Sequence, residues 1–195
     1  MTRGISLPKA KEKGATSLEQ TLNERRSVRD YKTDPLGLEE VSQLLWAASG
    51  VNLYRKTTPS AGATYPLETY LAAGEVGGLE PVFYHYSPSV HGLEIVRDED
   101  VRKNLSRAAL GQGIIARAPI DIVIAAEYGR TAVRYGQRAA RYVHMEAGHA
   151  GQNISLQAVA LGLGTVMIGA FDDEKVRAIL GIREEPLYII PVGRM

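Results

Sequence analysis

The amino-acid sequence predicts an α+β or three-layer fold around one sheet, rather than a doubly wound fold. Segments with helical and strand patterns follow one another without strict alternation. Two glycine pairs, in "GQGIIA" at residues 111–116 and in "GLGTVMIG" at residues 162–169, each follow a helical segment and lead toward a strand. A dinucleotide-binding fold requires strand, glycine turn and helix in that order, so we interpret both pairs as helix stops.

Five helices are predicted. Ser17 is a good N-cap for a first helix that runs to about Arg25. In the second, apolar residues recur at helical spacing from Leu38 onward, and Gly50 supplies the stop. The third, "DEDVRKNLSRAAL", has acidic residues at its positive end. The last two are a long helix over residues 137–161, with an inward stripe of apolar side chains, and "DDEKVRAIL", which a glycine closes.

Strands are predicted where apolar residues alternate or run continuously between turn residues. They are expected at residues 67–74 and 82–86, and in "PIDIVIAAE", "GTVMIG" and "LYIIPV". The segment "PIDIVIAAE" is expected at the centre of the sheet. The turn-rich segment "TTPSAGATYP" is expected to be a loop.

Length and composition indicate one globular unit. The chain has 195 residues, and we expect residues 1–16 to form a mobile N-terminal arm and residues 17–195 to form a single domain. The first residues lack the apolar segment of a signal peptide, which predicts a cytoplasmic protein. An uncharged stretch from Ala150 to Phe171 is interrupted by polar residues and glycines, so we expect a buried helix and strand there rather than a membrane span.

Charge and cysteine content exclude several classes of function. The net charge is only +1, so no global field recruits nucleic acid or an anionic membrane, and any anion site must be local. The absence of cysteine excludes disulfides, thiolate nucleophiles and cysteine-based zinc sites. No P-loop and no G-x-S-x-G motif is present.

The segment "HMEAGH" resembles a metal-binding motif but fails on spacing. His144 and His149 are five residues apart, which does not place them on one helical face. Glu146 and His149 have the E-x-x-H spacing of carboxylate-bridged metal sites, but those sites need a second copy of the motif. We therefore expect no metal, and a structural or interface role for this pair.

A basic stripe occupies the segment before and within the start of the long helix. A nucleic-acid surface would need interleaved aromatic residues and a basic domain, so a solvated or ion-paired face is the favoured interpretation. The stripe consists of Arg130, Arg134, Arg138 and Arg141.

The segment "ERRSVRDY", residues 24–31, concentrates Arg25, Arg26, Ser27 and Arg29. Arginine binds phosphate bidentately and keeps its charge at any working pH, so the cluster suits a phosphate group. The alternative is a helix C-terminus, where cations are favoured by the negative end of the dipole. Composition alone does not choose between the two.

Several separated motifs, in order, resemble the nitroreductase-like flavoenzymes. These are "RRSVRDY" near the start and "GLGTVMIGAFDDEKVRAILGI" with "PLYIIPVGR" near the end. The middle segments "TTPSAGATYPLETYLAAG" and "YGQRAARYVHMEAGHAGQNISLQAVALGLGT" are similar to the SagB-type dehydrogenase branch, whose members include azoline oxidases of peptide modification. The resemblance covers roughly residues 18–194 and implies a three-layer α/β/α sandwich with a mixed, mainly antiparallel sheet.

The resemblance also implies a cofactor and its contacts. The family binds FMN at a homodimer interface and takes electrons from NADH or NADPH. The phosphate and ribityl chain would be held by Arg25, Arg26, Ser27 and Arg29, and Arg194 would add a further phosphate contact. The flavin ring would be lined by the loop of Pro59, Ser60, Ala61, Gly62 and Ala63, and its N5 atom would face the turn at Gly169 and Ala170.

Catalytic candidates come from "VRYGQR". Azoline-oxidising relatives have a Lys-Tyr pair in this stretch, whereas this chain has Arg134 and Tyr135. Arginine stays protonated and cannot act as a base, so azoline oxidation is expected to be slow or absent. We expect an FMN-dependent oxidoreductase that reduces a small acceptor. Alternatives are an azoline oxidase in a peptide-modification system and a flavin-binding protein without turnover.

Overall fold

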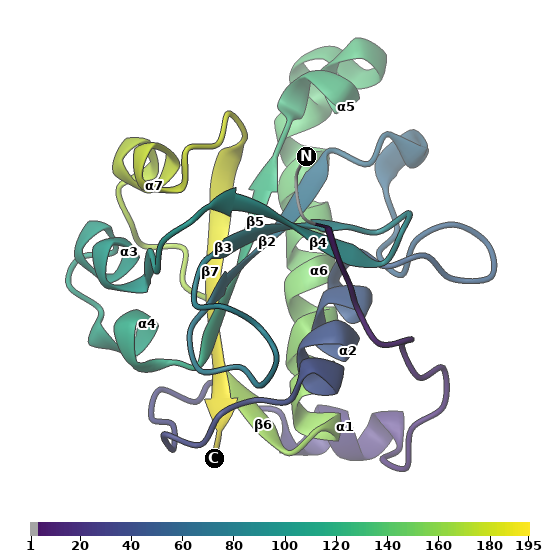
Figure 1. The fold of residues 1–195 in the computed structure, drawn as a ribbon. Coiled ribbons are helices and arrows are strands. Elements are labelled where there is room, and N and C mark those ends of the chain that lie inside the picture. The colour runs from purple at the N-terminus through teal and green to yellow at the C-terminus, as the bar shows by residue number, and fades with distance from the viewer. Residues whose placement is uncertain (1–3) are drawn as a thin grey trace.

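The computed structural model describes residues 4–195, and its centre is one seven-stranded sheet (Figure 1). The strand order is β1-β4-β3-β2-β5-β7-β6, and every neighbouring pair is antiparallel. The strands are β1 (Gly4–Ser6), β2 (Leu67–Ala73), β3 (Phe83–Ser87), β4 (Gly92–Arg97), β5 (Ile120–Ala126), β6 (Leu163–Thr165) and β7 (Glu185–Arg194).

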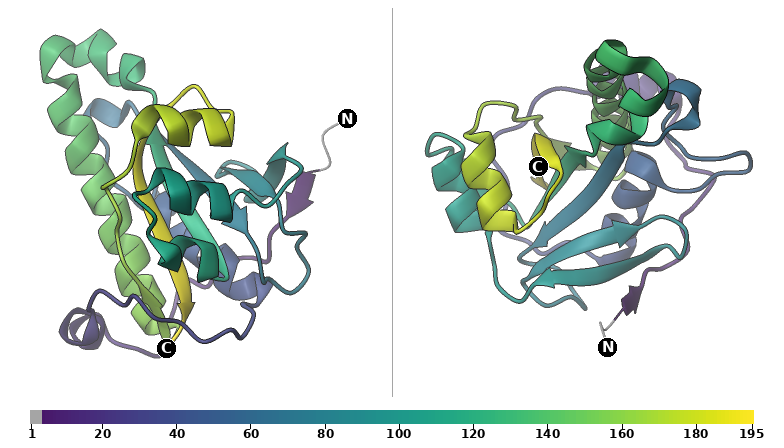
Figure 2. Two further views of the ribbon diagram at one scale, coloured as in Figure 1. Left: turned by 90° about the vertical axis from the view of Figure 1, so that its left-hand side faces the viewer. Right: turned by 90° about the horizontal axis from the view of Figure 1, so that it is seen from above.

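Helices cover both faces of this sheet, which confirms the predicted α+β three-layer sandwich. The α-helices are α1 (Leu18–Glu24), α2 (Leu38–Ser49), α3 (Arg102–Ala108), α4 (Gly113–Arg117), α5 (Tyr128–Tyr135), α6 (Ala139–Ala160) and α7 (Asp173–Leu180). Two short 3-10 turns are η1 (Ala61–Ala63) and η2 (Gly136–Arg138). Figure 2 shows α3, α4 and α7 on one side of the strands and α6 on the other, where α2 packs beside it. Each face has its own apolar core.

The 22-residue helix α6 determines the geometry of the molecule. Its predicted inward stripe is buried against the sheet, including Val143, Ala150 and Ile154, which have no exposed surface. At 1.5 Å per residue the helix is about 33 Å long. It begins at Ala139 rather than at residue 137, because Gly136 has a φ of +53° and interrupts the helical turn.

Two predicted boundaries were wrong for identifiable reasons. Helix α3 begins at Arg102 and leaves the acidic residues outside it, because the Asp100 carboxylate accepts hydrogen bonds from the Arg102 backbone and guanidinium. Strand β6 ends at Thr165 rather than at residue 169. Beyond it only Ile168 pairs again with β7.

The N-terminal segment lies on the sheet. We expected residues 1–16 to form a mobile arm; residues 1–3 lie outside the described residues. Strand β1 pairs with β4, Leu7 is 6% exposed, and the Pro8 carbonyl accepts a hydrogen bond from the Ser42 hydroxyl. Residues 4–8 are therefore packed on the domain rather than free of it.

Candidate functional site

The arginine segment is fixed to the edge of the sheet by backbone and packing contacts. Ser27 forms a parallel bridge with Thr165, and the Val28 N–H donates to the Thr165 carbonyl at 3.0 Å. The Val28 side chain packs on Gly164, where an added Cβ would lie 2.8 Å from the Val28 Cβ. A glycine is therefore required at this close approach.

Tyr31 secures the other end of the segment. Its hydroxyl donates to the Val28 carbonyl at 2.9 Å and lies 3.1 Å from the Pro191 carbonyl. Its ring packs on Gly193, where a Cβ would lie 2.7 Å from the Tyr31 Cγ. Burial raises the pKa of Tyr31, with the negative charge of Asp121 adding to the rise, so the phenol stays protonated.

The three arginines of this segment have no carboxylate partner in the part of the chain that the structure describes. Within residues 4–195, no carboxylate lies within ion-pair distance of Arg25, Arg26 or Arg29. By contrast, the Arg102 guanidinium pairs with Glu75 at 2.9 Å. The helix-dipole alternative does not account for all three, because α1 ends at Glu24 and only the next residues lie at its C-terminus. The cluster can therefore accept an external anion.

Arg194 lies in a different environment. Its guanidinium forms two hydrogen bonds with the Glu40 carboxylate, at 2.9 and 3.0 Å, and lies 3.3 Å from the Pro35 carbonyl. A phosphate contact from Arg194 would require this ion pair to open. The structure does not bring this residue together with the arginine segment as a free cation.

The turn at Gly169 and Ala170 follows β6, the strand whose end bridges to the arginine segment. Both residues are exposed, and a Cβ on Gly169 would meet nothing closer than 3.8 Å. The Gln112 side-chain amide donates to the Ala170 carbonyl at 3.1 Å and holds the turn. Gly169 lies four residues beyond Thr165, at most about 13 Å along an extended chain. The turn and the arginine segment therefore belong to the same part of the molecule.

The loop of Pro59, Ser60, Ala61, Gly62 and Ala63 has an unusual backbone. Gly62 and Ala63 have φ values of +57° and +54°. The Ser60 hydroxyl oxygen accepts a hydrogen bond from the backbone N–H of Tyr65, itself at a φ of +46°, across 2.9 Å. Left-handed non-glycine residues are costly and cluster at functional sites.

Helix α5 places both catalytic candidates against this loop. The Arg134 guanidinium donates to the Gly62 carbonyl at 3.2 Å. A Cβ on Gly62 would lie 2.7 Å from the Tyr135 hydroxyl and 2.9 Å from the Arg134 side chain. The Tyr135 ring packs edge-on against Tyr142, with centroids 4.8 Å apart. The structure therefore brings the predicted ring loop and the predicted catalytic pair together.

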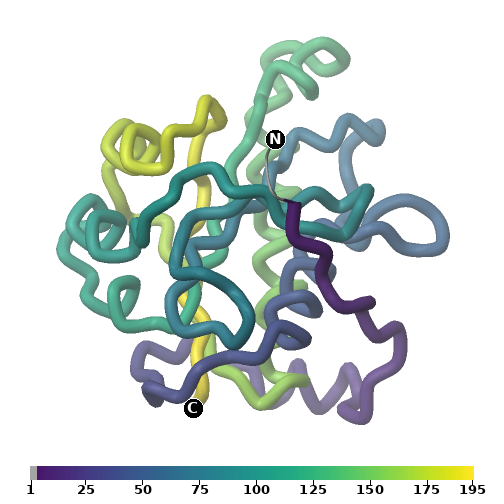
Figure 3. Tube along the Cα trace, in the orientation of Figure 1, coloured from purple at the N-terminus to yellow at the C-terminus, as the bar shows by residue number. Residues whose placement is uncertain are grey.

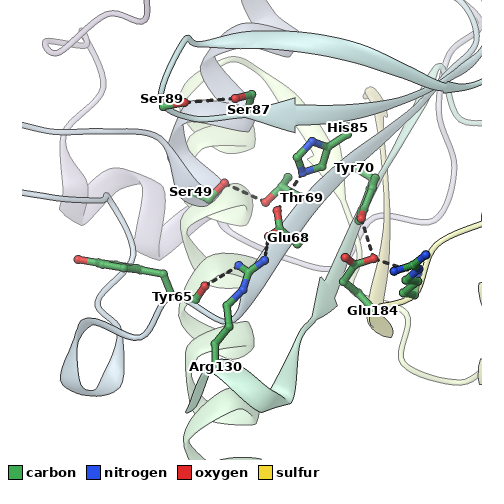
Figure 4. A network of polar contacts seen from close by, with 11 residues as sticks. Ser49, Tyr65, Glu68, Thr69, Tyr70, His85, Ser87, Ser89, Arg130 and Glu184 are labelled. Carbon is green, nitrogen blue, oxygen red and sulfur yellow. Dashed lines mark hydrogen bonds and ion pairs between the residues drawn. The ribbon is translucent and has the colours of Figure 1, made fainter. Parts of the chain in front are cut away.

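A polar network supports the loop from the sheet (Figure 4). Arg130 pairs with Glu68 on β2 and donates to the Tyr65 carbonyl at 3.0 Å, and His85 on β3 contacts the same carboxylate at 2.9 Å. Burial would raise the pKa of Glu68, but the hydrogen bonds from His85 and Arg130 lower it overall. Arg130 thus belongs to an ion-paired face, as favoured from the sequence.

The two groups of predicted site residues lie on opposite flanks of α6. Asn153 faces the loop side, where its amide donates to the Thr58 hydroxyl at 3.2 Å. Gly151 faces the other side, where a Cβ would lie 2.5 Å from the Met167 sulfur. Positions two residues apart on a helix differ by about 200° in direction. Figure 3 shows residues 57–65 and residues 165–171 on opposite sides of this helix. The loop of residues 57–65 and the segment of residues 165–171 therefore lie against different sides of α6.

Sequence reasoning missed two titratable groups beside the loop. Glu146 on α6 is only 4% exposed; burial raises its pKa to about 7, and the Ser60 hydroxyl and Lys56 partly oppose the rise. Burial also lowers the pKa of Lys56, whose ammonium lies 5.0 Å from the centroid of the Tyr65 ring. The E-x-x-H spacing singles out Glu146 in the sequence, but no sequence signal shows that this side chain faces a loop some 85 residues earlier.

The metal-like and membrane-like segments are parts of α6 and of the elements that follow it. The His144 ring contacts the Tyr128 hydroxyl at 2.7 Å. Within residues 4–195, no three His, Cys, Asp or Glu side chains are grouped to hold a metal ion. No helix in the described part of the chain is long and apolar enough to cross a bilayer. The uncharged stretch from Ala150 to Phe171 forms the end of α6, strand β6 and a loop.

Comparison with known proteins identifies the family. A sequence model described as the nitroreductase family matches residues 22–194. The chain belongs to the nitroreductase family. Membership supports an oxidoreductase enzyme and agrees with the fold.

Two relatives match nearly the whole of this nitroreductase-family chain but differ in their own length. Nitroreductase MJ1384 of Methanocaldococcus jannaschii is 51% identical over 195 residues, which cover 99% of this chain and 97% of that protein. The solved structure of a nitroreductase from Anabaena variabilis superposes with a TM-score of 0.88 and 33% identity, over 99% of this chain and 42% of the other.

Two more distant curated relatives are longer than this chain. A Bacillus subtilis protein named as an NAD(P)H FMN reductase is 23% identical over 190 residues, which cover 89% of this chain and 62% of that protein. The trifolitoxin operon protein TfxC of Rhizobium leguminosarum bv. trifolii is 24% identical over 206 residues, which cover 94% of this chain and 57% of that protein.

Proposed function

We propose that this protein is an FMN-dependent oxidoreductase that passes electrons from NADH or NADPH to a small oxidised acceptor. The observation that carries the proposal is a set of three arginines without carboxylate partners among the described residues. Their segment is attached through Ser27 and Val28 to the end of β6, which leads to the exposed turn at Gly169. A phosphate monoester carries close to two negative charges at neutral pH, which this cluster can neutralise. Family membership and the FMN reductase relative support the choice of flavin.

The residues present fit FMN in charge, and the turn at Gly169 leaves room beside its backbone. Arg25, Arg26 and Arg29, with the Ser27 hydroxyl, would hold the phosphate and ribityl chain. The open turn at Gly169 would let backbone N–H groups approach the flat ring. When bound, FMN supplies the redox chemistry, and the protein positions it and shapes the pocket. We leave Arg194 out of the phosphate site because Glu40 already neutralises it.

We further propose a homodimer that closes the flavin site. Because the loop at residues 59–63 and the arginine segment lie on opposite flanks of α6, the loop of a second protomer would complete the site. Leu18 and Leu22 on α1 and Met145 on α6 are each more than half exposed, and each offers an apolar side chain for such a contact.

A dimer is expected in sedimentation at micromolar concentration. Met145→Arg should dissociate it and lower flavin occupancy, because an exposed position tolerates arginine in the isolated protomer but not in an apolar interface. Val90→Arg, at a position 69% exposed on the turn between β3 and β4, is the matched control and should stay dimeric. A monomer that binds FMN tightly would contradict the proposed dimer.

The test of the overall proposal is anaerobic spectroscopy of the purified protein. We expect a yellow protein whose flavin absorbance is bleached by NADH or NADPH. Purified protein that neither contains nor takes up FMN would show the proposal to be wrong. Bound flavin that neither nicotinamide bleaches would support the alternative of a flavin-binding protein without turnover. The cytoplasmic location stays a prediction, to be checked by cell fractionation.

The trifolitoxin relative favours testing azoline oxidation as a second function. We expect slow or absent azole formation, together with NAD(P)H-dependent reduction of quinones or nitroaromatics. The reason is that Arg134 lies beside the loop at Gly62 and stays protonated, so it cannot remove a proton from the substrate. Both reactions should be measured on flavin-loaded protein and on Arg134→Lys. Rapid azole formation by the unmodified protein would overturn this prediction.

A further inference from the structure

A buried acid lies behind an open cavity at the loop of residues 59–63. The cavity has a volume of ≈ 420 Å³, and Lys56, Ser60 and Tyr65 contribute to its lining. Glu146 does not line it; this side chain is 4% exposed on α6.

Glu146 lies two turns before Asn153 on the same face of the helix, and Asn153 donates to the Thr58 hydroxyl at 3.2 Å. Glu146 therefore faces the same loop, where the Ser60 hydroxyl acts on its carboxyl. Ser60 thus lies between the cavity and the buried carboxyl.

We infer that Glu146 is the proton-holding group of this site and that Ser60 relays its proton into the cavity. The inference rests on the proposed function, because it assigns the proton source for the reduction of a quinone-like acceptor. Arg134 cannot take this role, since its guanidinium does not release a proton at working pH. A buried carboxyl can, because desolvation favours its neutral form.

The proton balance requires such a group. Reduction of a quinone to a hydroquinone takes two electrons and two protons, and a reduced nicotinamide supplies both electrons but only one proton. The second proton leaves the Glu146 carboxyl, whose O–H bond breaks with the electron pair staying on the carboxylate. Ser60 Oγ takes up that proton and gives its own to the acceptor oxygen. Solvent water then reprotonates Glu146.

The hydrogen bonds of Ser60 permit this relay. Its oxygen already accepts the Tyr65 N–H at 2.9 Å, which fixes the side chain. One lone pair and the hydroxyl proton remain, so Ser60 can accept from a protonated Glu146 and donate into the cavity, or donate to an ionised Glu146.

The charges around Glu146 stabilise it after proton release. The positive charge of Lys56, in the loop, lowers the pKa of Glu146. The charge of Glu68 on β2 raises the pKa of Lys56, and the charge of Arg130 on α5 lowers it. On its own helix, His149 lies one turn away in sequence. The balance of burial and these charges raises the pKa of Glu146 to about 7, so the carboxyl is protonated below neutral pH and loses its proton above it.

The stability of the folded protein should depend on pH through Glu146. The folded-state pKa is higher than the ordinary value of 4.5, so this group's contribution to stability is fully present below about 4.5 and is lost as pH rises through about 7. Acceptor reduction should fall over the same upper range, because the proton-holding form disappears.

The experiment compares Glu146→Gln, Glu146→Asp and the matched control Glu94→Gln, an exposed carboxyl on β4, with the unmodified protein. Glu146→Gln should lower quinone reduction on the order of 10²-fold at pH 6 and remove its decline near pH 7. Glu146→Asp should restore part of the rate with a shifted profile. Ser60→Ala should lower the rate without removing the pH dependence of stability.

A readout independent of activity separates this inference from the proposed function. In thermal unfolding of flavin-free protein, Glu146→Gln should be more stable than the unmodified protein at pH 8 and equal to it at pH 4.5, and Glu94→Gln should show no such difference. An unchanged pH–rate profile in flavin-loaded Glu146→Gln would overturn the inference while leaving the oxidoreductase proposal intact. Absence of bound FMN in all forms would instead reject the proposed function.

Discussion

Arg25→Ala and Arg29→Ala are each expected to weaken FMN binding by about 1–3 kcal/mol, which is roughly 5- to 150-fold in the dissociation constant. Each substitution removes a guanidinium that has no competing carboxylate in the described part of the protein, so its charge is available to the phosphate. The segment itself should stay folded, because Ser27 and Val28 remain attached to Thr165 through the backbone. Fluorescence titration of flavin-free protein measures the effect.

Riboflavin and a distant arginine provide the controls. Riboflavin lacks the phosphate, so it should bind the unmodified protein and both variants about equally weakly. Arg107→Ala, at an exposed position on α3, should leave FMN affinity unchanged. If Arg25→Ala and Arg29→Ala bind FMN as tightly as the unmodified protein, the phosphate lies elsewhere.

Asp121→Val is expected to stabilise the protein by about 1–3 kcal/mol at neutral pH. Asp121 lies on β5 with no exposed surface, and neither carboxylate oxygen has a hydrogen-bond partner within residues 4–195. Burial holds its pKa well above the usual range, and the Arg102 charge only partly opposes this. Valine suits a buried strand and removes the unpaired polar group. Thermal or denaturant unfolding measures the change.

The change of stability with pH shows whether the cost of Asp121 comes from its ionisation or from its unpaired polar atoms. Because the folded-state pKa is raised above the ordinary 3.8, the stability contributed by the protonated Asp121 is present below about pH 4 and is lost as pH rises toward the folded-state pKa. The advantage of Asp121→Val should therefore grow from pH 4 upward. Asp121→Asn keeps a polar group and cannot ionise, so it should remove the pH dependence with a smaller gain in stability. An Asp121→Val variant less stable than the parent at pH 8 would contradict this account.

The strongest local patterns predicted their elements well. The apolar run of β5, the stripe of α6 and the glycine stop after α7 each depend on residues close in sequence, and all three are present. Strands β1 and β4 and helices α4 and α5 were missed. Strand β4 buries only Gly92 and Leu93, and helix α5 buries only Thr131, so neither has a long buried apolar face.

The candidate site, like the fold, could be predicted from the sequence only in part. Three arginines within five residues allowed two interpretations from the sequence, an anion site or a helix C-terminus, because both depend only on local charge. Sequence could not show that Arg194 is neutralised by Glu40, 154 positions away, or that Glu146 faces Ser60 across 86 positions. Both facts depend on which helix faces are turned toward each other.

The sequence by itself therefore determined the layers and the arginine segment, since each rests on a contiguous pattern of hydrophobicity or charge, and its separated motifs indicated the nitroreductase family. Only the tertiary structure decided which of those residues meet. It placed the loop at residues 59–63 beside Arg134, Tyr135 and Glu146, and the arginine segment beside β6, with α6 between them. The physical reason is the helix itself: neighbouring positions on α6 face different ways, and packing on the sheet fixes which flank each loop covers.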